Sequence, residues 1–80
     1  MARATFHPLA DRELIDAARY YERVSPGLGS SFLDAAERCE RAISEYPEAG
    51  TSIRDDVRRR LLQVFPYALL YKARSDGIRI

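Results

Sequence analysis

The fold class is decided by the stretch VRRRLLQVFPYALLYKARSDGIRI, residues 57–80. Its first part favours a strand over residues 57–64, and the Phe-Pro pair at its end must interrupt that strand because proline cannot donate into a ladder. Residues 67–73 are aromatic and apolar and predict a second, buried strand. Ser75-Asp76-Gly77 predicts a tight hairpin turn, since Asp-Gly tolerates the positive φ angles of a type I′ turn. A third strand begins at residue 78, so this end of the chain predicts antiparallel β-sheet.

Two amphipathic helices are predicted upstream of this sheet. Apolar residues recur at spacings of three and four, and the first helix therefore runs from about Pro8, which suits the first helical position, to Arg23. Ser25-Pro26-Gly27 breaks it and supplies a cap and a first position for the second helix, which Tyr46-Pro47 ends. So short a break predicts an antiparallel helix pair.

The whole chain is predicted to be α+β, in the order β-α-α-β-β-β. Residues 2–6 alternate weakly and predict a short first strand, while residues 48–53 are predicted to be loop. The residues predicted to be buried where the helices meet the sheet are Leu14, Tyr21, Phe32, Cys39, Ile43, Leu70 and Tyr71.

The last predicted strand, residues 78–80, is too short to cover its neighbour and leaves backbone groups open at a sheet edge. Either the natural protein continues past Ile80, the interpretation we favour, or a partner supplies a strand. We therefore expect residues 1–80 to be a single domain that is incomplete at its C-terminus.

Composition indicates a small globular protein of the cytoplasm. The 80 residues include no apolar stretch near the roughly 20 residues of a membrane span, and we expect no signal peptide. The single cysteine cannot form an internal disulfide, as expected in a reducing compartment. We predict no membrane association.

The net charge of +1 hides an asymmetry along the chain. Residues 9–48 carry nine acidic against five basic side chains, and residues 54–80 carry seven basic against three acidic ones. Such a split gives the strand side a positive potential. It is either an ordinary solvated surface or a surface for an anionic partner.

Familiar catalytic and metal motifs are missing from the sequence. The glycines lie apart in turns, and one histidine with one cysteine cannot make a zinc site of the usual spacing, so no metal or cofactor is expected. His7 lies beside Pro8 and suits a turn or strand end. Cys39 lies on the apolar stripe of the second helix and is predicted to be a core residue.

The side chains suited to chemistry or binding are basic and aromatic. Arg58 and Arg60 project from one face of their strand, and Arg59 from the other. Tyr67 and Tyr71 share a face of the following strand. A basic sheet with tyrosines can hold a nucleic-acid backbone and stack a base. The alternative is that the tyrosines are core residues and the arginines only confer solubility.

The order of these residues resembles the RelE/ParE toxin superfamily of bacterial type II toxin–antitoxin systems. The resemblance covers almost the whole chain and rests on the following segments: Phe6-His7-Pro8, Tyr20-Tyr21-Glu22, Gly27-Leu28-Gly29, Phe32-Leu33, Arg58-Arg59-Arg60, Phe65-Pro66-Tyr67 and Leu70-Tyr71. It implies a compact toxin that binds a cognate antitoxin.

Members of this superfamily either cleave mRNA on the ribosome or poison DNA gyrase. The resemblance implies that Arg58 and Arg60 take the places of the nuclease branch's phosphate contacts. That branch also has an arginine where this chain has Ala68, and its last catalytic residues lie on a final strand beyond the end of this sequence. The Phe-Pro-Tyr segment is more similar to the ParE-like, plasmid stabilisation branch.

The resemblance therefore implies a ParE-like toxin, neutralised by its antitoxin and acting on DNA gyrase. The alternatives are a ribosome-dependent mRNA interferase, which would be an endoribonuclease, and an inactive truncated toxin that only binds antitoxin. We expect this 80-residue chain not to be an enzyme. The candidate contacts to antitoxin or nucleic acid are Arg58, Arg60, Lys72, Arg74 and Arg79, of which the first two are the catalytic candidates.

Overall fold

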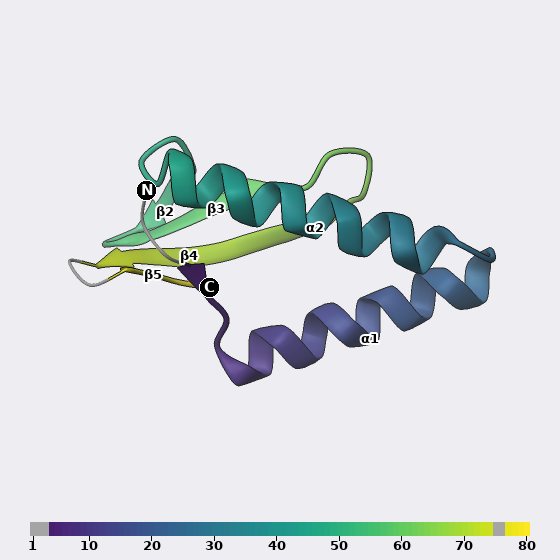
Figure 1. Cartoon of the computed structure of the whole chain (residues 1–80). Coiled ribbons are helices and arrows are strands. Elements are labelled where there is room, and N and C mark those ends of the chain that lie inside the picture. Colours follow the sequence, from purple (N-terminus) through teal and green to yellow (C-terminus); the bar gives the residue numbers. More distant parts are fainter. Residues whose placement is uncertain (1–3, 75–76) are drawn as a thin grey trace.

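The computed structural model describes residues 4–74 and 77–80, with only the backbone of Arg74, and confirms the predicted α+β order of elements (Figure 1). The elements are β1 (Ala4–Thr5), α1 (Pro8–Val24), α2 (Leu28–Glu45), β2 (Thr51–Arg54), β3 (Val57–Leu61), β4 (Ala68–Arg74) and β5 (Gly77–Arg79). Helix α2 lies along the sheet. Helix α1 meets α2 at their short connection and diverges from it towards β1 (Figure 1).

Helix α1 begins at Pro8, as predicted, and extends one residue beyond its predicted end, to Val24. Its cap is His7, whose Nδ1 accepts a hydrogen bond from the backbone N–H of Leu9 at 3.1 Å. This bond satisfies one of the free N–H groups of the first turn. The histidine therefore has a local structural role.

The predicted start of the second helix is wrong by two residues. Helix α2 begins at Leu28, and its N-cap is Gly27 with φ of 87°, so Ser25 is not the cap. The carboxylate of Glu22, in the last turns of α1, accepts from the backbone N–H groups of Gly27 and Gly29 at 3.0 Å each. The side chain of Glu22, from the preceding helix, thus caps the N-terminus of α2. A local sequence pattern does not reveal a cap of this kind. The helix ends before Tyr46-Pro47, as predicted.

The five strands form one sheet in the order β1-β5-β4-β3-β2. The predicted open edge at β5 is wrong, because β1 pairs with β5 in parallel. Ile80 donates to the carbonyl of Thr5 and His7 donates to the carbonyl of Ile80, both at 2.8 Å. The chain therefore covers this edge with its own N-terminal strand, and the remaining pairs are antiparallel. The turn predicted at Ser75-Asp76-Gly77 lies partly outside the described residues, but the strands on either side of it pair as predicted.

The prediction of a loop over residues 48–53 is also wrong in part. Strand β2 occupies Thr51–Arg54 and pairs with β3 at the edge of the sheet, with an irregularity in its register. All its residues are exposed, so it has no apolar alternation that would identify it as a strand. Strand β3 ends at Leu61, earlier than predicted, and the loop that follows places Val64 at φ of 74°.

The core lies between α2 and the sheet, and α1 closes it at one end. Its buried members are Ala18, Phe32, Ala35, Ala36, Cys39, Ile43, Leu62, Leu69, Tyr71, Ile78 and Ile80. Of the predicted core, Leu14 and Tyr21 are only half-buried, although both pack against this cluster. The prediction that Leu70 is buried is wrong, since its side chain is 52% exposed. Side chains alternate along β4, and the neighbouring Leu69 and Tyr71 point inward.

Candidate functional site

The pairing of the strands assigns each predicted contact residue to a face of the sheet. Arg58 is opposite Tyr71 and Arg60 is opposite Leu69, so both arginines lie on the inner face of the sheet with the core residues. The prediction that Arg58 and Arg60 share a face is confirmed. Lys72 is opposite Arg79 and lies on the outer face. The side chain of Arg74 is outside what the structure describes. The candidate residues therefore do not form one site.

Arg58 is bound to the loop that joins α2 to β2. Its guanidinium donates to the backbone carbonyl of Gly50 at 2.9 Å and to that of Glu48 at 3.1 Å. The buried hydroxyl of Tyr71 donates to the carbonyl of Pro47 in the same loop at 2.7 Å. Two side chains of the sheet thus bind three backbone carbonyl groups of this loop, those of Pro47, Glu48 and Gly50. This arrangement gives Arg58 a structural role.

Arg60 lies in a different environment, beside α2. It lines a cleft of about 170 Å³ together with Arg38, Gln63 and the thiol of Cys39. The thiol points towards the backbone carbonyls of Arg60 and Leu61, at 3.7 and 3.9 Å. Burial raises the pKa of this thiol, and the nearby charge of Arg60 opposes the shift. Cys39 is thus a buried thiol of the core, as predicted.

The outer face of the sheet carries exposed leucines among basic side chains. Leu61 is 63% and Leu70 is 52% exposed, and Arg59 lies directly opposite Leu70. Lys72 and Arg79 continue the same face towards β5, and Lys72 makes a loose ion pair with Asp56 at 3.8 Å. We call the surface formed by Arg59, Leu61, Leu70, Lys72 and Arg79 the open sheet face.

Sequence reasoning missed part of this surface. The sequence does not predict Arg59 and Leu61 as contact residues, and it predicts Leu70 to be buried in the core. The alternation of side chains along a strand could have identified it. Once Tyr71 is assigned to the core, Leu70 must point outward.

Of the two tyrosines of the predicted nucleic-acid platform, Tyr71 belongs to the core and Tyr67 packs against it. Tyr71 is 2% exposed and its hydroxyl is bound to the loop. Tyr67 packs edge-on against Phe32, with ring centroids 5.0 Å apart. Tyr71 therefore has no free ring face on which a base could stack, whereas Tyr67 is half-buried and packs against the core.

Residues 4–80 match the family described as ParE toxin of type II toxin–antitoxin system, parDE. The chain belongs to the ParE toxin family. It is therefore a toxin of the type II toxin–antitoxin class, as its resemblance to the RelE/ParE superfamily implied. Comparison with curated proteins and with solved structures gave no significant match.

Two further properties of this ParE-family toxin concern its chemistry and its surroundings. Over the described residues, 4–74 and 77–80, no three His, Cys, Asp or Glu side chains are grouped so that they could hold a metal ion. In the same part of the chain, neither helix combines the length and the apolar character needed to cross a membrane.

Proposed function

We propose that this toxin is neutralised by a cognate antitoxin whose acidic, amphipathic segment covers the open sheet face. The composition of that face carries the proposal. Leu61 and Leu70 are exposed between three cationic side chains, so an acidic segment with apolar anchors would bury the leucines and pair with the cations. Segments of this kind are disordered when free and become ordered on binding.

We further propose that the toxin acts in the cytoplasm on DNA gyrase and serves plasmid stabilisation. The Phe65-Pro66-Tyr67 segment, with its similarity to the ParE-like branch, supports this target. Two observations disfavour mRNA cleavage: Ala68 stands where the nuclease branch has an arginine, and the guanidinium of Arg58 is bound to backbone carbonyls. These two bonds from Nη1 give Arg58 a structural role, which supports a target other than mRNA.

Co-expression with the small neighbouring gene tests the antitoxin partnership. A tag on either protein should purify both. Reversing two charges of the open sheet face, with Lys72→Glu and Arg79→Glu, should abolish the complex through repulsion of the acidic segment. The matched control reverses Arg12 and Arg23 of α1, both exposed, and should leave the complex intact.

The possible results separate the parts of the proposal. If the wild-type proteins do not bind each other, the antitoxin partnership is wrong. If the complex survives the reversal of Lys72 and Arg79, the partnership stands but the open sheet face is not the docking surface. Supercoiling by purified gyrase should stop when the toxin is added, and mRNA in a translation reaction should remain uncut. Cleaved mRNA with active gyrase would establish the alternative target.

A further inference from the structure

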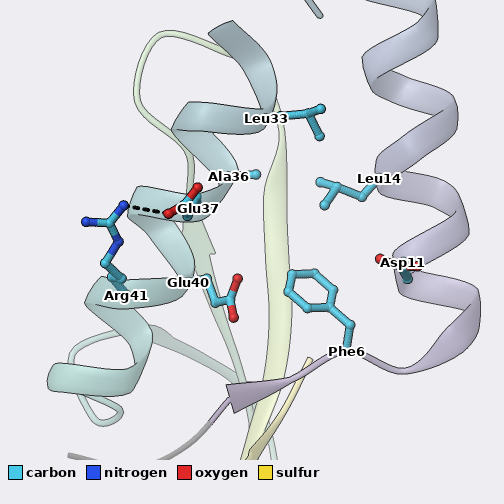
Figure 2. A pocket seen from close by; sticks show the side chains of 8 residues that line it. All are labelled: Phe6, Asp11, Leu14, Leu33, Ala36, Glu37, Glu40 and Arg41. Carbon is cyan, nitrogen blue, oxygen red and sulfur yellow. Dashed lines mark hydrogen bonds and ion pairs between the residues drawn. The ribbon is translucent and has the colours of Figure 1, made fainter. Parts of the chain in front are cut away.

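A second surface of opposite character lies between the two helices. Where α1 and α2 diverge, they leave a groove of about 560 Å³ (Figure 2). Its apolar lining includes Phe6, Leu14 and Leu33, which point towards one another across the opening (Figure 2). Leu33 is 42% exposed, and Phe6 and Leu14 are only half-buried. The helix pair thus leaves apolar side chains partly uncovered at its open end.

The charged side chains of the groove are mainly acidic. Glu37 is neutralised by Arg41, whose guanidinium donates to it at 2.7 Å. Asp11 lies in the first turn of α1, where the helix dipole stabilises a carboxylate. Glu40 differs from both: it is half-buried, and within residues 4–74 and 77–80 no ion pair or hydrogen bond reaches its carboxylate. Its carboxylate points to the ring of Phe6 (Figure 2).

The folded protein disfavours the ionised form of Glu40. Burial and the neighbouring charge of Glu37 raise its pKa, and Arg41 only partly offsets them. A partly desolvated carboxylate without a partner is stabilised by a cation brought close to it. A guanidinium or ammonium group placed beside Glu40 would also lie near the ring of Phe6, an arrangement that attracts cations to aromatic rings.

We propose that this groove binds a basic, amphipathic segment of a partner protein. An arginine or lysine of the segment pairs with Glu40 against the ring of Phe6, while an aliphatic side chain of the segment covers Leu14 and Leu33. The charge of the groove selects this occupant, because an acidic segment or a nucleic acid is repelled there. The open sheet face has the opposite sign, so one segment cannot suit both surfaces. This inference does not depend on the toxin's target or on its antitoxin.

The test uses the whole protein and a synthetic peptide. The probe is an amphipathic peptide of about four helical turns, with leucines on one face and arginines on the other. A second peptide of the same pattern carries glutamate in place of arginine. Isothermal titration calorimetry should show that the arginine peptide binds. The glutamate peptide suits the open sheet face and should leave the chemical shifts of Phe6, Leu14 and Leu33 unchanged. Chemical-shift changes at Phe6, Leu14 and Leu33 should locate the binding site.

Variants of Glu40 test whether its carboxylate pairs with an arginine of the peptide. Glu40→Gln should weaken the arginine peptide by about fivefold, as expected for a partly exposed ion pair. The matched control is Glu45→Gln, the same change on the same helix outside the groove lining, and it should have no effect. Glu40→Lys should exclude the arginine peptide and admit the glutamate peptide. Thermal unfolding of each variant shows that it is folded, and Glu40→Gln should not lower the melting temperature.

Three results would overturn the proposal. The first is the absence of binding by the arginine peptide, and the second is an equal loss from Glu40→Gln and Glu45→Gln. The third is self-association of the protein in analytical ultracentrifugation that Glu40→Gln reverses, since the occupant would then be a second copy of this chain. Binding of the glutamate peptide in the groove of Glu40→Lys would support the proposal most strongly.

Discussion

Replacing Arg58 by alanine should destabilise this protein rather than remove a catalytic group. The change deletes both hydrogen bonds from the guanidinium to the loop, to the carbonyls of Gly50 and Glu48. A hydrogen bond from a charged donor contributes about 1.5–3 kcal/mol when it is well buried. Arg58 is half-buried and water can replace part of the loss, so we expect about 2 kcal/mol for both bonds together. In a domain this small, that corresponds to a fall in melting temperature of about 8–16 °C.

Urea and thermal unfolding of three variants measure this effect. Arg59→Ala is the matched control, because its exposed side chain makes no hydrogen bond within the described residues, and it should change stability by less than about 0.5 kcal/mol. Arg60→Ala, on the inner face but away from the loop, should lie between the two. Equal unfolding free energies for Arg58→Ala and Arg59→Ala would refute the structural role of Arg58. A loss of toxicity in Arg58→Ala is meaningful only after this measurement.

Three further experiments, with four substitutions, test the packing and the electrostatics. Gly50→Ala places a methyl group against the hydroxyl of Tyr71 and 3.0 Å from the carbonyl of Arg59, so it should cost about 1–3 kcal/mol in urea unfolding. Tyr71→Phe removes that hydroxyl, and the loss from Gly50→Ala should be smaller in its presence; additive losses would contradict the contact. Val64→Gly should raise the melting temperature, because Val64 is 96% exposed and its left-handed backbone disfavours a β-branched residue by about 1–2 kcal/mol. A lower melting temperature would show that its conformation is not strained. Because the folded state raises the pKa of Glu40, its ionised form lowers stability, so Glu40→Gln should be more stable than wild type at neutral pH. That difference should vanish as the pH falls below the pKa of glutamate in the unfolded chain, and a difference independent of pH would contradict it.

The elements with strong periodic patterns could be predicted from the sequence. Both helices have apolar residues at regular spacings. Pro8 correctly predicts the start of α1, and Tyr46-Pro47 predicts the end of α2 at Glu45 to within one residue. Strand β2 could not be found in this way, since its residues are all exposed and it is held by β3 and by the loop that Arg58 anchors. The cap of α2 also depends on a contact across the helix turn, from Glu22, which no local pattern encodes.

The surfaces were harder to predict than the fold, because their composition depends on strand register. The sequence indicated that Arg58 and Arg60 share a face, but not that this face is the one packed under α2. The pairing of β1 with β5 joins residues at opposite ends of the chain. Local sequence patterns therefore could not predict that β1 covers the edge of β5. The groove between the helices depends on the angle at which they diverge, and Glu40 looks like any other surface glutamate until that angle is known.

The most direct test of the antitoxin proposal is the affinity of the neighbouring gene's product for the variant Leu70→Asp. Leu70 is at the centre of the open sheet face and half of its surface is exposed, so aspartate there puts a negative charge under the acidic segment without opening the core. Ile53→Asp on β2, at a residue 48% exposed, is the matched control. Calorimetry should show a loss of affinity of about 100-fold or more for Leu70→Asp, typical of an interface anchor, and little change for Ile53→Asp. Wild-type affinity in the Leu70→Asp variant would contradict the proposal that the antitoxin binds the open sheet face.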